Sequence, residues 1–135
     1  MNGTLSNRVG IVTGASSGMG FTTANMLAEA GAAIFAISRS GQPKGKTPFS
    51  ENVISVKGDV TDYPAMERII KEIGEKSGID FLVNNAGITV RKRAELFTDE
   101  DFDRIHKVNV YSVFKLSCLC YPYLKQSQSV GRIIN

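Results

Sequence analysis

The chain has 135 residues, a net charge of +3, and 42% hydrophobic and 21% charged residues, which suits one globular domain with a core. The charge is too weak to indicate a nucleic-acid-binding protein, and no basic stripe interleaved with aromatic residues occurs. No apolar run reaches the length of a membrane span, and residues 1–8 are polar, unlike a signal peptide. We therefore expect a cytoplasmic protein that binds neither membranes nor nucleic acids.

The two cysteines, Cys118 and Cys120, lie two residues apart in a helix-like stretch, so their side chains should point away from each other. This spacing predicts buried or half-buried reduced thiols, and no disulfide or metal site.

The amino-terminal part of the chain predicts a strand, a glycine-rich turn and a helix. Arg8–Thr13 is the first predicted strand, and its centre, Val9–Val12, shows no alternation, as expected for a strand covered on both faces. A helical pattern covers Phe21–Ala30. Glycines between them permit a tight turn and a close phosphate, and a helix N-terminus attracts a pyrophosphate. The predicted phosphate-binding residues are Gly14, Ala15, Ser16, Ser17, Gly18, Met19 and Gly20.

The second predicted strand, Ala33–Ile37, leads to Ser38 and Arg39. In dinucleotide-binding folds an acidic residue near this point binds the ribose hydroxyls of NAD, whereas an arginine accommodates the 2′-phosphate of NADP. Because no carboxylate follows this strand and a guanidinium can bind a phosphate through two hydrogen bonds, the sequence favours NADP over NAD.

Residues 41–52 contain two glycines and two prolines and no helical period, so a loop is expected. Lys44 and Lys46 in this loop could approach a cofactor phosphate, but we interpret them as solvated. The third strand, Val53–Val56, is followed by Asp59 and Val60. Asp62 is a predicted N-cap of a helix whose apolar face is Met66, Ile69, Ile70 and Ile73.

The fourth strand, Phe81–Val83, runs into Asn84-Asn85-Ala86-Gly87. The small residues Ala86 and Gly87 allow a ribose to lie on the backbone, and the Asn84 amide can tie neighbouring strands together.

The patterns T-G-x-x-x-G-x-G (residues 13–20) and N-N-A-G (residues 84–87) resemble those of the short-chain dehydrogenase/reductase family. The resemblance implies an α/β fold, a Rossmann-type doubly wound parallel sheet in the order 3-2-1-4-5. It also implies that Asp59 binds the adenine amino group, that Val60 packs on the adenine ring, and that the cofactor lies against Asn85, Ala86 and Gly87. Asn109 matches the catalytic asparagine of the family, whose backbone carbonyl holds a water of a proton relay.

A long helix is predicted over residues 98–126, with Thr98 as its N-cap. In the family this helix forms a subunit interface, which implies a homodimer or homotetramer. The lone His106 receives no catalytic role, and the basic residues 91–93 are interpreted as solvated, although they could attract an anionic substrate.

The likeness covers the first half of a typical family member, up to a fifth strand at residues 131–135, so 1–135 is expected to be an incomplete dinucleotide-binding domain. The family's catalytic Ser and Tyr-x-x-x-Lys follow that strand. Tyr121 and Lys125 match the latter by letters, but Pro122 is expected to end the helix there, and we reject the pair. We therefore expect the 135 residues alone to be inactive.

The reaction implied by the resemblance is reversible hydride transfer between a nicotinamide and a ketone or secondary alcohol. The run from Asn84 to Lys92 is similar to gluconate 5-dehydrogenase and tropinone reductase types, which suggests a sugar acid or a cyclic ketone. A 3-oxoacyl-carrier-protein reductase, a non-catalytic nucleotide-binding module and an accidental truncation remain alternatives.

Overall fold

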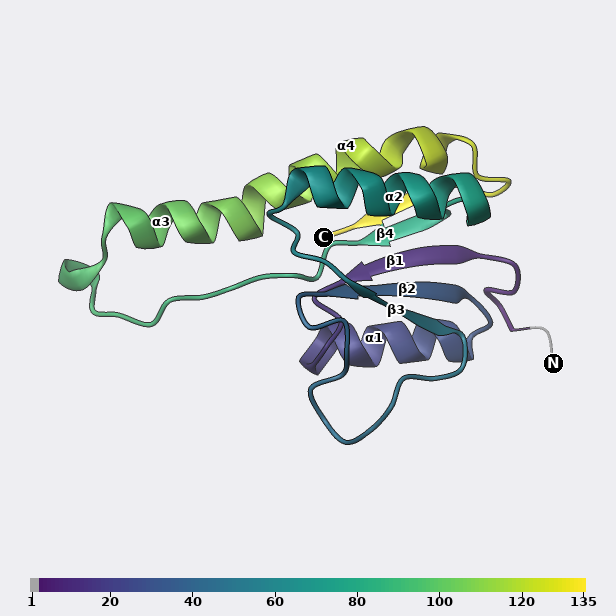
Figure 1. Cartoon of the computed structure of the whole chain (residues 1–135), viewed down its shortest axis with the longest axis horizontal. Coiled ribbons are helices and arrows are strands. Elements are labelled where there is room, and N and C mark those ends of the chain that lie inside the picture. The colour runs from purple at the N-terminus through teal and green to yellow at the C-terminus, as the bar shows by residue number, and fades with distance from the viewer. Residues whose placement is uncertain (1–2) are drawn as a thin grey trace.

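A computed structural model describes residues 3–135, which form a five-stranded parallel sheet in the order β3-β2-β1-β4-β5 (Figure 1). The predicted fold and strand order are confirmed. The strands are β1 (Val9–Thr13), β2 (Ala33–Ser38), β3 (Val53–Lys57), β4 (Phe81–Val83) and β5 (Arg132–Ile134). The longer helices are α1 (Gly18–Glu29), α2 (Tyr63–Ser77), α3 (Asp99–His106) and α4 (Ser112–Lys125).

The central strand β1 is covered on both faces of the sheet. Ile11 and Val12 are both fully buried, yet they belong to different apolar clusters because successive side chains of a strand point to opposite faces. Ile11 packs in the cluster of α2 and α4, whereas Val12 packs in that of α1. In Figure 1, α1 accordingly lies on one side of the sheet and α2 and α4 on the other. Burial on both faces explains why β1 shows no alternation in sequence.

Helix α2 behaves as its sequence predicts. The Asp62 side chain caps it by accepting a hydrogen bond from the backbone N–H of Ala65 at 3.1 Å. Met66, Ile70 and Ile73 are buried against the sheet. Asp62 and the 3.6-residue apolar period therefore determine the start and the buried face of this helix.

The predicted long helix is divided. Between α3 and α4 lies a π-helical segment, Lys107–Tyr111, with Asn109 at its centre. Helix α3 begins with a capping box in which Thr98 and Asp101 bond each other's backbone N–H groups. In Figure 1, α3 extends away from the sheet, while α4 packs along it.

Three local expectations need correction. Helix α1 begins at Gly18 rather than Phe21, so Met19 and Gly20 are helical. Pro122 lies inside α4, which continues to Lys125, so the proline does not end the helix as expected. Its position near the end of the helix limits the damage, since few intrahelical bonds follow it. Cys120 is buried as predicted, but Cys118 is exposed.

The two edge strands differ from the centre of the sheet, because β5 is exposed along its length and Ile54 of β3 is 47% exposed. Residues 41–52 form no helix, as predicted. Within residues 3–135, no helix is both long enough and apolar enough to cross a bilayer.

Candidate functional site

The two sequence motifs meet at the carboxyl ends of β1 and β4. Gly14 has a φ of +63°, and a Cβ atom on it would lie 2.8 Å from the Cα atom of Ala86. A side chain at position 14 would therefore be both strained and too close to the second motif. The glycine lets the backbone after β1 lie directly against the backbone after β4.

Thr13 joins these two segments. Its side chain is buried, and its Oγ1 accepts hydrogen bonds from the backbone N–H groups of Asn85 at 3.1 Å and Ala86 at 3.0 Å. In return, the Asn85 side-chain amide donates to the carbonyl oxygens of Thr13 at 3.0 Å and Gly14 at 3.2 Å. This role of Thr13 was not predicted from the sequence, where its only signal was its place before the first glycine. Asn85 stays a predicted cofactor contact, and its side chain in addition holds the glycine loop in place.

Gly20 completes the brace from α1. A Cβ atom on it would lie 2.4 Å from the carbonyl oxygen of Gly14 and 2.3 Å from Nδ2 of Asn85. Only glycine therefore allows the first turn of α1 to lie so near both motifs.

The amino end of α1 has free hydrogen-bond donors. Ser17 is the N-cap in an extended conformation, and its side chain makes no capping bond. Ser17, Gly18 and Met19 are exposed, whereas Ala15 and Ser16 are buried. Because the first N–H groups of a helix lack intrahelical partners and carry its positive dipole end, this turn is suited to bind a pyrophosphate.

The end of β2 supplies a turn and an exposed cation. The buried Ser38 accepts the backbone N–H of Gly41 on its Oγ at 3.1 Å, so its hydroxyl is engaged within the turn. Arg39 is exposed. Of the two residues predicted to select the cofactor, Arg39 is therefore the one free to reach a ligand.

Asp59 lies at the carboxyl end of β3. Its Oδ1 accepts hydrogen bonds from the backbone N–H of Thr61 at 2.9 Å and from the Thr61 hydroxyl at 2.8 Å. These bonds, chiefly the backbone one, lower the pKa of Asp59, and the positive charges of Arg39 and Lys107 act in the same direction. The carboxylate is therefore ionised at neutral pH. Its Oδ1 atom accepts both hydrogen bonds of the turn, whereas Oδ2 can accept a hydrogen bond from a ligand. Val60 is buried in the core.

The Asn109 side chain forms two hydrogen bonds with the segment that follows the second motif. Its Oδ1 accepts the backbone N–H of Ile88 at 2.8 Å, and its Nδ2 donates to the Ile88 carbonyl at 2.8 Å. Both polar atoms of the side chain thus make a hydrogen bond, and the π-helical segment breaks the regular helical bonding of the backbone around it. The role predicted for Asn109, a backbone carbonyl that holds a water, does not require its side chain.

Asn84 ties β4 to its neighbours, as predicted. Its Nδ2 donates to the side-chain oxygen of Asn135 at 2.9 Å and lies 3.3 Å from the hydroxyl of Ser117 on α4.

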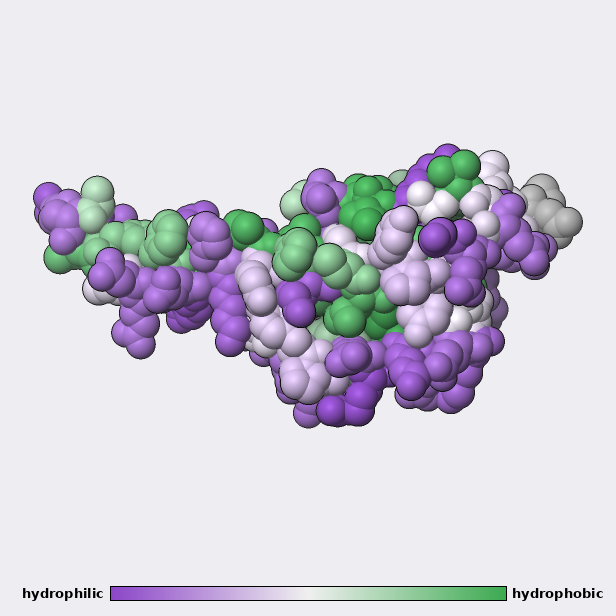
Figure 2. Space-filling model, turned by 90° about the horizontal axis from the view of Figure 1, so that it is seen from above, coloured by the Kyte–Doolittle hydropathy of each residue, from purple (hydrophilic) through white to green (hydrophobic). Residues whose placement is uncertain are grey.

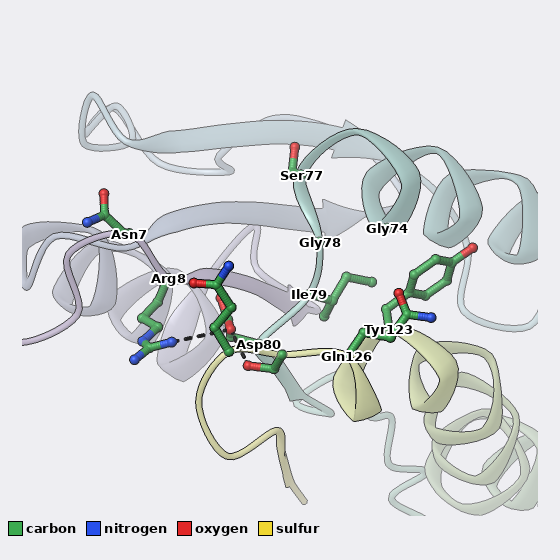
Figure 3. Close-up of a pocket in the computed structure, with 11 residues that line it drawn as sticks. Asn7, Arg8, Gly74, Ser77, Gly78, Ile79, Asp80, Tyr123 and Gln126 are labelled. Carbon is green, nitrogen blue, oxygen red and sulfur yellow. Dashed lines mark hydrogen bonds and ion pairs between the residues drawn. The ribbon is translucent and has the colours of Figure 1, made fainter.

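The opposite end of the sheet holds a hollow of about 300 Å³ near Asp80 (Figure 3). The Asp80 carboxylate already accepts the backbone N–H of Val9 at 2.8 Å and the hydroxyl of Ser127, and it pairs with Arg8 at 3.6 Å. Because these bonds satisfy it internally, the hollow is not the candidate site. Tyr123 and Gln126 line the hollow, which places the end of α4 here. Tyr121 and Lys125 therefore lie far from the glycine loop, which agrees with their rejection as a catalytic pair.

The model of the family described as short chain dehydrogenase matches residues 8–135. The chain belongs to this family. The family comprises oxidoreductases that bind NAD or NADP. The first turn of α1, whose N–H groups have no side-chain cap, and the close contact between the backbones of Gly14 and Ala86 fit such a dinucleotide. In residues 3–135, no three metal-ligating side chains gather in one place.

Among curated relatives, the chain is 36% identical to the 3-oxoacyl-[acyl-carrier-protein] reductase of Vibrio cholerae, over 97% of this chain and 54% of the relative. It is 34% identical to the 3-ketodihydrosphingosine reductase of Bacteroides thetaiotaomicron, over 93% and 45%. A similar solved structure is ligand-free aldohexose dehydrogenase of Thermoplasma acidophilum, with a TM-score of 0.81 and 28% identity, over 93% of this chain and 48% of the other. The chain thus spans about half the length of these relatives.

Proposed function

We propose that the chain is the cofactor-binding half of an NADP-dependent oxidoreductase that transfers hydride reversibly between the nicotinamide and a ketone or secondary alcohol. The observation that carries this proposal is the junction of Thr13, Gly14 and Asn85, which holds an uncapped helix N-terminus open beside two small residues, Ala86 and Gly87. Asp59 and Val60 would then lie along the adenine, and Asn109 would offer its backbone carbonyl to a proton relay.

The preference for NADP rests on the end of β2. Arg39 is exposed, and its neighbours in the sequence, Ser38 and Ser40, carry no charge that would repel a 2′-phosphate. Replacement of Arg39 by Ala should weaken NADPH binding by about 1.5–3 kcal/mol, the range for a hydrogen bond to a charged group, and leave NADH binding nearly unchanged.

The test is a titration of both cofactors by fluorescence, with Arg91→Ala as a control that removes an exposed arginine elsewhere. Equal losses for NADPH and NADH in Arg39→Ala would contradict the preference.

The substrate class has two candidates. The relative from V. cholerae is named a 3-oxoacyl-[acyl-carrier-protein] reductase, which favours a 3-oxoacyl thioester. The motif likeness to gluconate 5-dehydrogenase and tropinone reductase types favours a sugar acid or cyclic ketone. An NADPH-oxidation assay with the protein encoded by the complete reading frame and one ketone of each class distinguishes them.

We also propose that α3 and α4 contribute to a homodimer or homotetramer. Three apolar side chains of this region are each more than half exposed: Phe102, Val110 and Phe114. Figure 2 shows apolar patches along the projecting end of the molecule, which contains α3, and on the part next to it. Exposed apolar surface of this kind marks interaction sites. Sedimentation of wild type and Phe114→Asp would test it, because a charge at this face should favour the monomer.

A further inference from the structure

The loop of residues 41–52 is fixed onto the glycine loop and α1. The backbone N–H of Lys44 donates to the carbonyl of Ser16 at 2.8 Å, and the backbone N–H of Ser50 donates to Oδ1 of Asn25 at 2.8 Å. Between these anchors, the ring of Phe49 lies 5.2 Å from that of Phe21, measured between centroids. A segment without regular structure is therefore held in place by contacts with the predicted phosphate-binding element.

The first anchor holds Lys44 against the glycine loop, which is also bound to the end of β2. The backbone N–H of Ala15 donates to the carbonyl of Ile37 at 3.3 Å, so the glycine loop lies between the end of β2 and Lys44. Residues 38–50 include Arg39, Lys44 and Lys46 but no acidic residue. Arg39 and Lys44 therefore flank the same loop, and both are exposed.

Two considerations favour a phosphate as the partner of this pair. The free N–H groups of α1 suit the pyrophosphate, so a phosphate monoester on the ribose would need another group of donors. Arg39 also lies near enough to Asp59 to influence its ionisation, so part of its charge is compensated within the protein. A phosphate dianion is therefore better balanced by two cations than by Arg39 alone.

We propose that Lys44, positioned by the bond between its backbone and Ser16, binds the 2′-phosphate of the adenosine ribose together with Arg39 and so helps to select NADP. This inference rests on the proposed NADP-dependent function. Lys46 belongs to the same loop, but among residues 3–135 its backbone makes no hydrogen bond to the glycine loop, so it should not contribute.

The experiment compares 2′,5′-ADP, which carries the ribose phosphate, with 5′-AMP, which lacks it, by calorimetric titration of the 135-residue chain. Lys44→Ala keeps the backbone N–H and hence the anchor, so the variant removes only the cation. We expect it to weaken 2′,5′-ADP binding about fivefold to twentyfold, as for loss of one partly solvated charged hydrogen bond. Binding of 5′-AMP should stay within about twofold. Lys46→Ala is the matched control. Lys44→Arg keeps a cation at this position and should therefore bind 2′,5′-ADP about as tightly as wild type. Far-UV circular dichroism verifies that each variant is folded.

The possible failures are distinguishable. If Lys44→Ala behaves like Lys46→Ala, or weakens the binding of both nucleotides equally, the role of Lys44 is refuted. The proposed NADP function would still stand if the wild-type chain prefers 2′,5′-ADP and loses that preference in Arg39→Ala. If the wild-type chain binds 2′,5′-ADP no more tightly than 5′-AMP, the proposed NADP preference itself is refuted.

Discussion

The polar groups at the two ends of the parallel sheet differ in how completely they are hydrogen-bonded within the protein. At the amino end, Asp80 supplies the acceptor for the N–H of Val9 and is itself satisfied by Ser127 and Arg8. At the carboxyl end, Thr13 and Asn85 bind the strand ends to each other, but the first turn of α1 beyond them is left without a cap. One end is closed and stabilises the sheet, whereas the other retains unpaired donors, which a ligand can use.

The amino end should show the largest loss of stability. Asp80→Ala removes the acceptor of the Val9 N–H and the partner of Arg8, in a side chain that is only 14% exposed. We expect the free energy of unfolding to fall by about 2–4 kcal/mol, because a partly buried donor and a charge lose their partner. Urea denaturation measures this.

Ser127→Ala, which removes one donor to the same carboxylate, should cost about 1 kcal/mol and serves as the control for Asp80→Ala. A loss below that of the control would show that the amino end is not the closed, stabilising end.

The carboxyl end should couple stability to binding. Thr13→Val keeps the shape of the side chain but leaves the N–H groups of Asn85 and Ala86 without their acceptor. We expect a loss of about 1–3 kcal/mol of stability and weaker binding of both NADPH and NADH, because the brace serves the shared part of the cofactor. Thr13→Ser retains the hydroxyl and should restore both properties. Unchanged binding in a destabilised Thr13→Val protein would separate the brace from the site.

Helix α3, away from both ends, should respond to acid. Hydrogen bonds from Lys92 and Thr98 lower the pKa of Asp101 from its ordinary value of 3.8 to about 2. A lowered folded-state pKa adds stability that is complete above the ordinary value and is lost as pH falls toward 2. The difference in the free energy of unfolding between wild type and Asp101→Asn should thus be largest at pH 5 and should almost disappear by pH 2.

Chemical denaturation at several pH values measures that difference. Asp99→Asn, an exposed acid of the same turn, is the control. A difference that does not change with pH would contradict the role of the ionised Asp101.

The smallest effect concerns a hydroxyl near the carboxyl end. The Oη atom of Tyr63 is buried without a hydrogen-bond partner among residues 3–135, beside the ring of Tyr111 at 5.3 Å between centroids. Burial raises the pKa of this phenol above its ordinary value. Tyr63→Phe removes the unsatisfied group and should stabilise the protein by up to about 1 kcal/mol, whereas the exposed Tyr121→Phe should have no effect. A stability loss in Tyr63→Phe would mean that the hydroxyl has a partner.

Most of the fold could be predicted because its signals are local. The unalternated apolar run of β1, the apolar period of α2, and the capping residues Asp62 and Thr98 depend on neighbours within a few residues. The two motifs likewise place Gly14 and Asn85 after strands whose carboxyl ends share an edge. These features determine the elements and the position of the candidate site, whereas the strand order was predicted from the resemblance to the family.

Only the tertiary structure decided which polar groups bind each other. Thr13 and Asn85 are separated by 72 residues, and Lys44 meets Ser16 across a loop that has no periodic signal. The helix-breaking property of proline suggested that Pro122 ends a helix, but the helix continues through it to Lys125. Periodicity reports the buried face of one element, whereas a hydrogen-bond partner depends on which elements pack together and on how closely glycines such as Gly20 let them approach.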